Sequence, residues 1–106
     1  MRLMDDEVME SLKGHTIRKA IHDKDPVAVV KYFNPFGAGT WYVAGAKKEK
    51  GGDWLFYGFV ESPIDPLFDE WGYFTLKELE SIRTPFGGLE RDLYFEPVKV
   101  SKIQKP

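Results

Sequence analysis

Residues 54–60, with the sequence Trp-Leu-Phe-Tyr-Gly-Phe-Val, contain no charged side chain. The side chains of a β-strand alternate between its two faces, so a strand that is apolar throughout needs cover on both sides. This segment therefore predicts a central strand in a sheet that is covered on two faces. Gly58 within it indicates a β-bulge or the close approach of another backbone segment.

Further strands are predicted on both sides of this central one. They are rich in β-branched and aromatic residues, and proline and glycine fill the turns between them. The predicted strands are residues 27–33, 40–44 and 71–74, with a fifth at 92–95 and an edge piece at 97–100. We expect strands that follow one another in the chain to pair as an antiparallel meander.

Residues 75–78, Thr-Leu-Lys-Glu, form a capping box. In this motif the threonine hydroxyl accepts from the Glu78 N–H, and the Glu78 carboxylate accepts from the Thr75 N–H. The helix that follows is predicted over residues 76–83, because Pro85 disfavours helical geometry in the residue before it.

A further helix is predicted in the first quarter of the chain. Acidic residues at positions 5–7 favour a helix N-terminus, and apolar spacing then predicts a helix over residues 3–13. Residues 15–25 are compatible with a loop or with a short helix. The fold class is therefore α+β, an antiparallel meander sheet of four to five strands with one or two short helices.

The chain has 106 residues, a length typical of one domain. We expect a single domain over residues 1–106. Its parts are an N-terminal helical segment (about 3–25), the sheet with the capped helix (about 26–100) and a frayed tail (101–106).

Cysteine is absent, which excludes disulfides, thiolate metal sites and a cysteine nucleophile. No apolar run approaches the roughly 20 residues that span a bilayer, and the acidic start is unlike a secretory signal. We therefore expect a cytoplasmic protein with no membrane partner.

Charged residues are nearly balanced, with 15 basic and 17 acidic side chains and an isoelectric point of about 5.7. A dedicated DNA-binding domain is usually basic, so any nucleic-acid partner would depend on local clusters. Two such clusters are Lys47, Lys48 and Lys50, and Lys99, Lys102 and Lys105.

Carboxylates gather between residues 61 and 80, where six acids and one lysine leave a net charge of −5. Their spacing fits no calcium-binding loop. A solvated acidic face is the main interpretation, and a docking surface for a basic partner is the second. His15 and His22 are seven residues apart, whereas zinc ligands are usually closer and need sulfur or further nitrogen ligands. We therefore expect no metal and no cofactor.

Glu90, Arg91 and Asp92 are the best catalytic candidates. Two carboxylates beside a guanidinium can act in acid–base chemistry, or can form an ion-pair network that holds a loop to the sheet. The enzymatic alternative is a small metal-assisted hydrolase or nuclease, with Mg²⁺ near the acidic loop at 61–70.

Aromatic residues are abundant, with eight Phe, five Tyr and three Trp. Many lie on three neighbouring predicted strands, and aromatic-rich exposed surfaces mark binding sites. The first hypothesis is therefore a non-enzymatic binding module that docks a protein or nucleic acid through Trp41 and Tyr42, with Lys31 beside them. The alternatives are that both sheet faces are simply packed with large side chains, or that a homodimer buries the apolar face or edge.

Two turns of the chain are alike: residues 34–38, Asn-Pro-Phe-Gly-Ala, and residues 84–88, Thr-Pro-Phe-Gly-Gly. Turn chemistry is enough to explain the likeness. We interpret them as two similar turns and not as a duplicated functional loop.

Five blocks of the chain are similar to an uncharacterised family of small bacterial proteins, a domain of unknown function carried on plasmids, integrative elements and phages. The blocks are residues 31–35, 40–43, 54–60, 72–80 and 90–95. The resemblance implies a mobile-element setting and no particular activity. The chain departs from the family pattern after residue 43, where Ala-Gly-Ala follows in place of an expected acidic residue.

Overall fold

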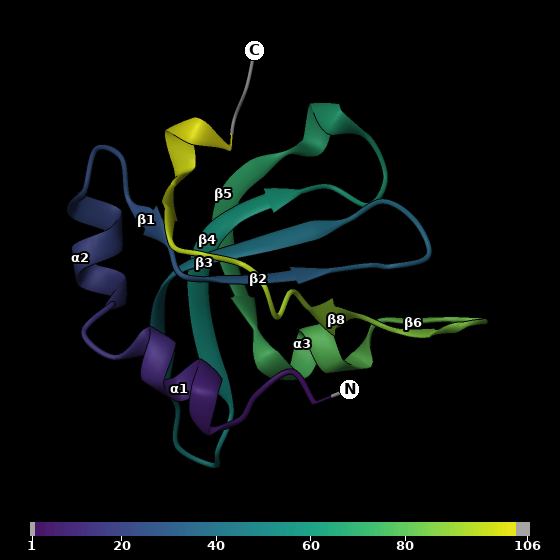
Figure 1. Ribbon diagram of the computed structural model, residues 1–106, viewed down its shortest axis with the longest axis horizontal. Coiled ribbons are helices and arrows are strands. Elements are labelled where there is room, and N and C mark those ends of the chain that lie inside the picture. Colours follow the sequence, from purple (N-terminus) through teal and green to yellow (C-terminus); the bar gives the residue numbers. More distant parts are fainter. Residues whose placement is uncertain (1, 104–106) are drawn as a thin grey trace.

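The computed structural model describes residues 2–103 and contains a five-stranded antiparallel sheet (Figure 1). Four strands form a meander, and a fifth returns to pair with the first of them, so the spatial order is β5-β4-β3-β2-β8. The strands are β2 (Val30–Phe33), β3 (Thr40–Lys48), β4 (Trp54–Glu61), β5 (Glu70–Thr75) and β8 (Glu90–Arg91). The predicted α+β class and antiparallel meander are confirmed.

The strand predicted over residues 27–33 is divided in two. β1 (Val27–Ala28) leaves the main sheet and pairs with β9 (Val98–Lys99), near the C-terminus. Val29 lies between β1 and β2 and donates its N–H to the Val43 carbonyl at 2.8 Å. The C-terminal segment, yellow in Figure 1, thus returns to the start of the sheet.

The prediction of a fifth strand at 92–95 is wrong in its position. The strand is β8, two residues earlier, and it pairs with β2. Asp92 ends it, because its side chain accepts from the Tyr94 N–H at 2.9 Å and its carbonyl accepts from the Phe95 N–H at 3.3 Å. Hydrogen bonds of this kind, from the backbone to a nearby side chain, compete with the hydrogen bonds between strands and favour a turn.

Three short helices are present: α1 (Asp6–Leu12), α2 (Ile17–His22) and α3 (Leu76–Ser81). The predicted capping box of α3 is confirmed, with both of its hydrogen bonds at 3.1 Å. The open segment 15–25 contains α2, which begins where the Thr16 hydroxyl accepts from the Lys19 N–H. None of the helices in residues 2–103 is long and apolar enough to cross a membrane.

The sheet is covered on both faces. Leu3, Val8 of α1 and Leu79 of α3 pack with Tyr32 and Phe56 in the main core, which lies on the first face. The second face is covered by α2, by the β1–β9 pair and by the 3₁₀ helix η2 (Val100–Lys102), with Val100 buried on it.

Two glycines allow cover to approach the strands closely. A Cβ at Gly45 would lie 2.8 Å from the Ile17 Cα and the Thr16 carbonyl oxygen, so α2 rests directly on β3. A Cβ at Gly58 would collide with the Tyr42 carbonyl oxygen, where the register between β3 and β4 shifts from Val43 to Gly45. The close approach expected at Gly58 is confirmed.

Small elements complete the described chain: a hairpin of β6 (Arg83–Thr84) and β7 (Gly87–Gly88), and a 3₁₀ helix η1 (Pro66–Phe68) in the acidic loop. α3 ends at Ser81, two residues before the expected end. The predicted frayed tail falls partly outside the described residues, and its first two residues belong to η2.

Candidate functional site

Three aromatic side chains form a row on the second face, where β4 and β5 pair. The Tyr57 ring stacks on Trp71 with centroids 5.5 Å apart and planes at 23°, and it contacts Tyr73 with centroids 5.1 Å apart. The register places Tyr57 opposite Tyr73, and alternation along β5 puts Trp71 on the same face. We call Tyr57, Trp71 and Tyr73 the aromatic surface.

A second core cluster lies on this face and contains the buried residues Ala28, Tyr42, Phe59 and Val100. The row of aromatic side chains extends outward from this second cluster. The Phe59 ring meets Trp71 edge-on with centroids 5.9 Å apart, and Phe59 and Trp71 pack with Val100 in that cluster. Tyr73, at the outer end, is 59% exposed, whereas Tyr57 and Trp71 are partly buried. The exposed end is therefore held by a rigid stack that is anchored in the core.

A pocket of about 400 Å³ opens above this row, between α2 and η2. Tyr57 and Trp71 line it from the sheet, Ile21 from α2 and Ser101 from η2. Ile21 is 44% exposed, so the rim is apolar as well. A pocket with aromatic and aliphatic walls and charged groups at one side is suited to a side chain with an apolar stem and a polar end.

The charged groups at the pocket are Asp23, Lys24 and Asp25. Asp25 ties η2 to the loop after α2, because its carboxylate accepts from the Ser101 hydroxyl at 2.6 Å and from the Ser101 N–H at 2.9 Å. These two hydrogen bonds lower the pKa of Asp25 below its ordinary value. Asp25 therefore keeps its negative charge at the pocket well below neutral pH.

The structure separates the predicted binding residues. Trp41 is 7% exposed and lies in the main core on the first face, out of reach of a docked partner. Tyr42 and Lys31 come together on the second face, with the ammonium 5.8 Å from the ring centroid. Lys31 also pairs with Asp92 at 3.8 Å.

Tyr42 is held from both ends. Its ring packs in the second cluster, and its hydroxyl donates to the Glu61 carboxylate at 2.9 Å. Burial raises the pKa of this phenol, and the hydrogen bond to Glu61 raises it further. Tyr42 is therefore a neutral supporting group of the same face that carries the aromatic surface.

The proposed catalytic triplet does not converge. Arg91 donates to Asp5 at 2.9 Å and to Glu7 at 3.2 Å, both at the start of α1. Asp92 pairs with Lys31, and Glu90 lines a different cavity. In residues 2–103, no group of three or more His, Cys, Asp or Glu side chains is placed to hold a metal ion.

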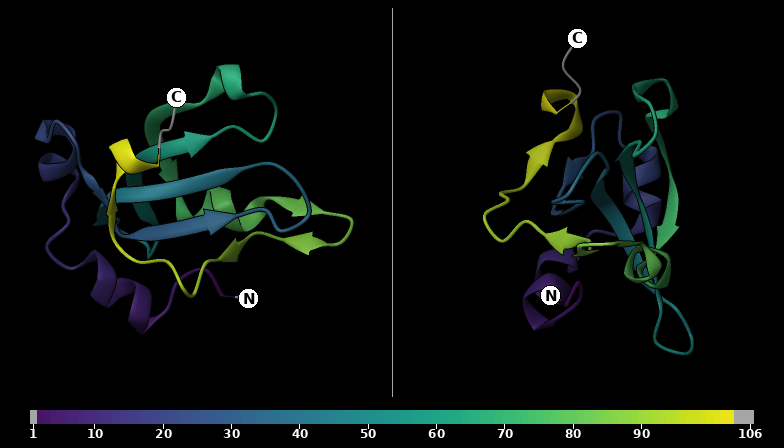
Figure 2. Two further views of the ribbon diagram at one scale, coloured as in Figure 1. Left: turned by 45° about the horizontal axis from the view of Figure 1, so that its top comes forward. Right: turned by 90° about the vertical axis from the view of Figure 1, so that its right-hand side faces the viewer.

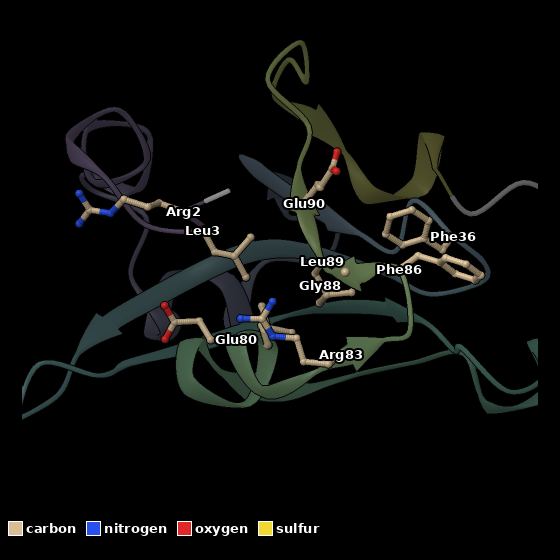
Figure 3. Close-up of a pocket in the computed structure, with 11 residues that line it drawn as sticks. Arg2, Leu3, Phe36, Glu80, Arg83, Phe86, Gly88, Leu89 and Glu90 are labelled. Carbon is tan, nitrogen blue, oxygen red and sulfur yellow. The ribbon is translucent and has the colours of Figure 1, made fainter.

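That second cavity, of about 420 Å³, lies between the N-terminal segment, α3 and the β6–β7 hairpin (Figure 3). Its charged lining residues are Arg2, Glu80, Arg83 and Glu90, two of each sign. The mixture gives the cavity no dominant charge, and a nucleophile with an adjacent base is not among the lining residues.

The two similar turns meet at one end of this cavity. Phe36 and Phe86 lie side by side in Figure 3, with ring centroids 5.8 Å apart. In each turn a side-chain oxygen accepts from the phenylalanine N–H: that of Asn34 at 3.0 Å and that of Thr84 at 3.1 Å. The two turns therefore share this hydrogen bond, although their backbones differ, because Gly87 has a positive φ and the equivalent Gly37 does not.

Comparison with known families places the chain in an uncharacterised group. The family described as "Protein of unknown function (DUF2958)" matches residues 3–103, nearly the whole sequence, and the chain belongs to it. No curated protein and no solved structure matches the chain.

Sequence reasoning did not select Trp71 and Tyr73 as site residues. Their signal was the alternation within residues 71–74, where Trp71 and Tyr73 share one face and Phe74 takes the other. Only the register with β4 shows that this face meets Tyr57 and the pocket.

Proposed function

We propose that the protein is a non-enzymatic binding module of a mobile genetic element, and that it docks a protein partner on the aromatic surface. The main support is the stacked row that ends in the exposed Tyr73 ring beside the pocket. Rigid aromatic side chains lose little conformational entropy on binding, and tyrosine and tryptophan are enriched at interface hot spots.

The local charge favours a protein over a nucleic acid. Binding of single strands combines aromatic stacking with a groove lined by basic residues. The pocket lining carries one lysine, Lys24, and two acids, Asp23 and Asp25, and the loop before β5 carries Asp65 and Asp69 and no basic residue. These side chains do not form the continuous basic groove that a phosphate backbone needs.

The mobile-element setting rests on the sequence resemblance. It predicts that the partner is encoded by the same element or is a host protein that the element exploits. The family match adds no activity to this proposal.

The test is affinity capture from cells that naturally carry the gene, with and without nuclease. We expect a protein that survives nuclease treatment, is lost with Tyr73→Ala and is retained with Tyr94→Ala. Tyr94 is the matched control, because it is 92% exposed and lies in the loop after β8.

Two results would contradict the proposal. One is capture that disappears with nuclease, which would indicate a nucleic-acid partner. The other is equal capture by the Tyr73→Ala and Tyr94→Ala variants, which would place the docking site elsewhere. Circular dichroism of both variants checks that the fold is retained.

A further inference from the structure

β5 is an outer strand of the main sheet. In the part of the chain that the structure describes, only β4 pairs with it, and Figure 2 shows it at the margin of the sheet in the right-hand view. The β4–β5 register is continuous from Glu70 to Thr75. Alternate N–H and C=O groups of an edge strand point away from the sheet and remain available to an added strand.

This edge lacks the features that usually prevent strand addition. Natural edges are protected by lysine, proline, bulges or very short length. β5 has six residues, Glu-Trp-Gly-Tyr-Phe-Thr, with neither lysine nor proline, and its register shows no shift. Its one charged residue, Glu70, is at the first position and leaves the other five positions uncharged. The strand at the opposite margin, β8, has only two residues.

The aromatic surface lies directly beside this edge. An added strand runs about 4.8 Å from its neighbour, and every second side chain of it would point to the second face. Those side chains would meet Trp71 and the exposed Tyr73. A long side chain next to Trp71 can extend toward the pocket that Trp71 and Tyr57 line.

The charges around β5 favour a basic segment. Glu70 begins the strand and is exposed, the loop before β5 carries Asp65 and Asp69 and no basic residue, and Asp23 and Asp25 line the pocket together with Lys24. Lysine or arginine side chains would meet opposite charge there, and their cations bind favourably over tryptophan and tyrosine rings.

The same charges disfavour a second copy of the chain. Antiparallel pairing of two β5 edges would bring the acidic loop before β5 of one copy beside α3 of the other. α3 carries Glu78 and Glu80 against the single Lys77. Juxtaposed like charges oppose association and direct the edge toward a different partner.

We infer that the β5 edge receives an extended, basic segment of a protein partner as an additional strand, with alternate side chains resting on Trp71 and Tyr73. This inference rests on the proposed function and specifies its partner. The added backbone hydrogen bonds supply affinity, and the aromatic surface and its acidic surroundings supply selectivity.

The probe is a pool of eight-residue peptides in which lysine alternates with Val, Ile, Leu, Tyr or Trp. One control pool carries glutamate in place of lysine. A second control pool has the lysine sequences N-methylated on every backbone nitrogen, which removes the donors of a β ladder but keeps the side chains. Binding is measured by calorimetry, and amide hydrogen exchange locates it.

We expect the lysine pool to bind and to slow amide exchange within β5 by about tenfold or more. Binding should weaken by about tenfold with Tyr73→Ala, with the glutamate pool and with the N-methylated pool. The Tyr94→Ala variant should bind like the parent protein.

Each other result overturns the inference. No binding of the lysine pool, equal binding of the glutamate pool, or binding without protection in β5 excludes a basic strand at this edge. Protection of β5 in the free protein together with a dimer in light scattering indicates a second copy. If the N-methylated pool binds as well as the lysine pool but needs Tyr73, strand addition fails while the proposed function stands. If Tyr73→Ala changes nothing, both fail.

Discussion

Arg91 and Asp5 form an ion pair at 2.9 Å, although 86 positions separate them in the sequence. The other oxygen of the Asp5 carboxylate accepts from the Val8 N–H, also at 2.9 Å, and so caps α1. One carboxylate thus begins the first helix and attaches it to β8, the last strand of the main sheet.

The link between Asp5 and Arg91 predicts a measurable coupling. Asp5→Ala removes a cap and an ion pair and should lower the free energy of unfolding by about 1–3 kcal/mol. Asp5→Asn retains a capping oxygen and should lower it less. A double-mutant cycle with Arg91→Ala, measured by urea unfolding, should give a coupling energy of about 1 kcal/mol. Additive effects would show that the two side chains act independently.

Gly58 and Gly72 provide a matched pair, because they face each other across β4 and β5. A Cβ at Gly58 would collide with the Tyr42 carbonyl oxygen, whereas nothing lies within 4 Å of one at Gly72. Gly58→Ala should therefore destabilise the protein by about 3 kcal/mol or more. Gly72→Ala should change the stability by less than about 1 kcal/mol. Thermal unfolding distinguishes them, and similar losses in both variants would contradict the close contact.

The Asp25–Ser101 hydrogen bonds predict an acid-sensitive attachment of η2. They lower the pKa of Asp25 below 3.8, so their contribution is present above that pH and is lost as the pH falls through the lowered pKa. Ser101→Ala should raise the Asp25 pKa toward its ordinary value, as measured by NMR titration of the carboxyl carbon. An unchanged titration curve would show that the serine does not stabilise the charge.

Two tyrosines predict a loss of stability at high pH. Burial raises the pKa of Tyr32, whose hydroxyl donates to the Leu3 carbonyl at 2.7 Å, and burial also raises that of Tyr42. A raised phenol pKa contributes stability that is fully present below the ordinary value of 10.0 and is lost as the pH rises above it. Tyr32→Phe should cost about 1 kcal/mol at neutral pH and should make the alkaline loss less steep. Denaturant unfolding from pH 7 to pH 11 tests this, and an equally steep loss in the variant would exclude Tyr32 as a source.

Local patterns predicted the elements whose signals are contained in a few neighbouring residues. The capping box at Thr75 and Glu78 and the two-sided apolar strand at 54–60 are of this kind. The predicted position of the fifth strand, residues 92–95, was wrong, because the Asp92 side chain stabilises a turn there. The sequence did not decide between a loop and a helix for residues 15–25, because α2 depends on its contact with Gly45 as well as on its own short sequence.

The sequence predicted an aromatic sheet surface, but it did not select the residues of the aromatic surface proposed here. The excess of aromatic residues indicated a binding surface on the sheet. Trp41 and Tyr42 were selected because they lie on one of the predicted aromatic-rich strands. Alternation places these two on opposite faces, and which face is sealed depends on segments far away in the chain. Trp41 is buried in the first-face core together with residues of α1 and α3, whereas a pocket remains between α2 and η2 above Tyr57 and Trp71.

By itself the sequence determined the fold class, the capping box of α3 and the two-sided apolar strand at 54–60, because backbone geometry and side-chain alternation act over a few residues. The tertiary structure alone decided which rings are buried, which carboxylates pair with Arg91 and which strand lies at the edge. These properties depend on contacts between distant segments, such as Asp5 with Arg91 and Asp25 with Ser101. Register and packing, which no local pattern specifies, therefore place the aromatic surface beside the edge strand β5.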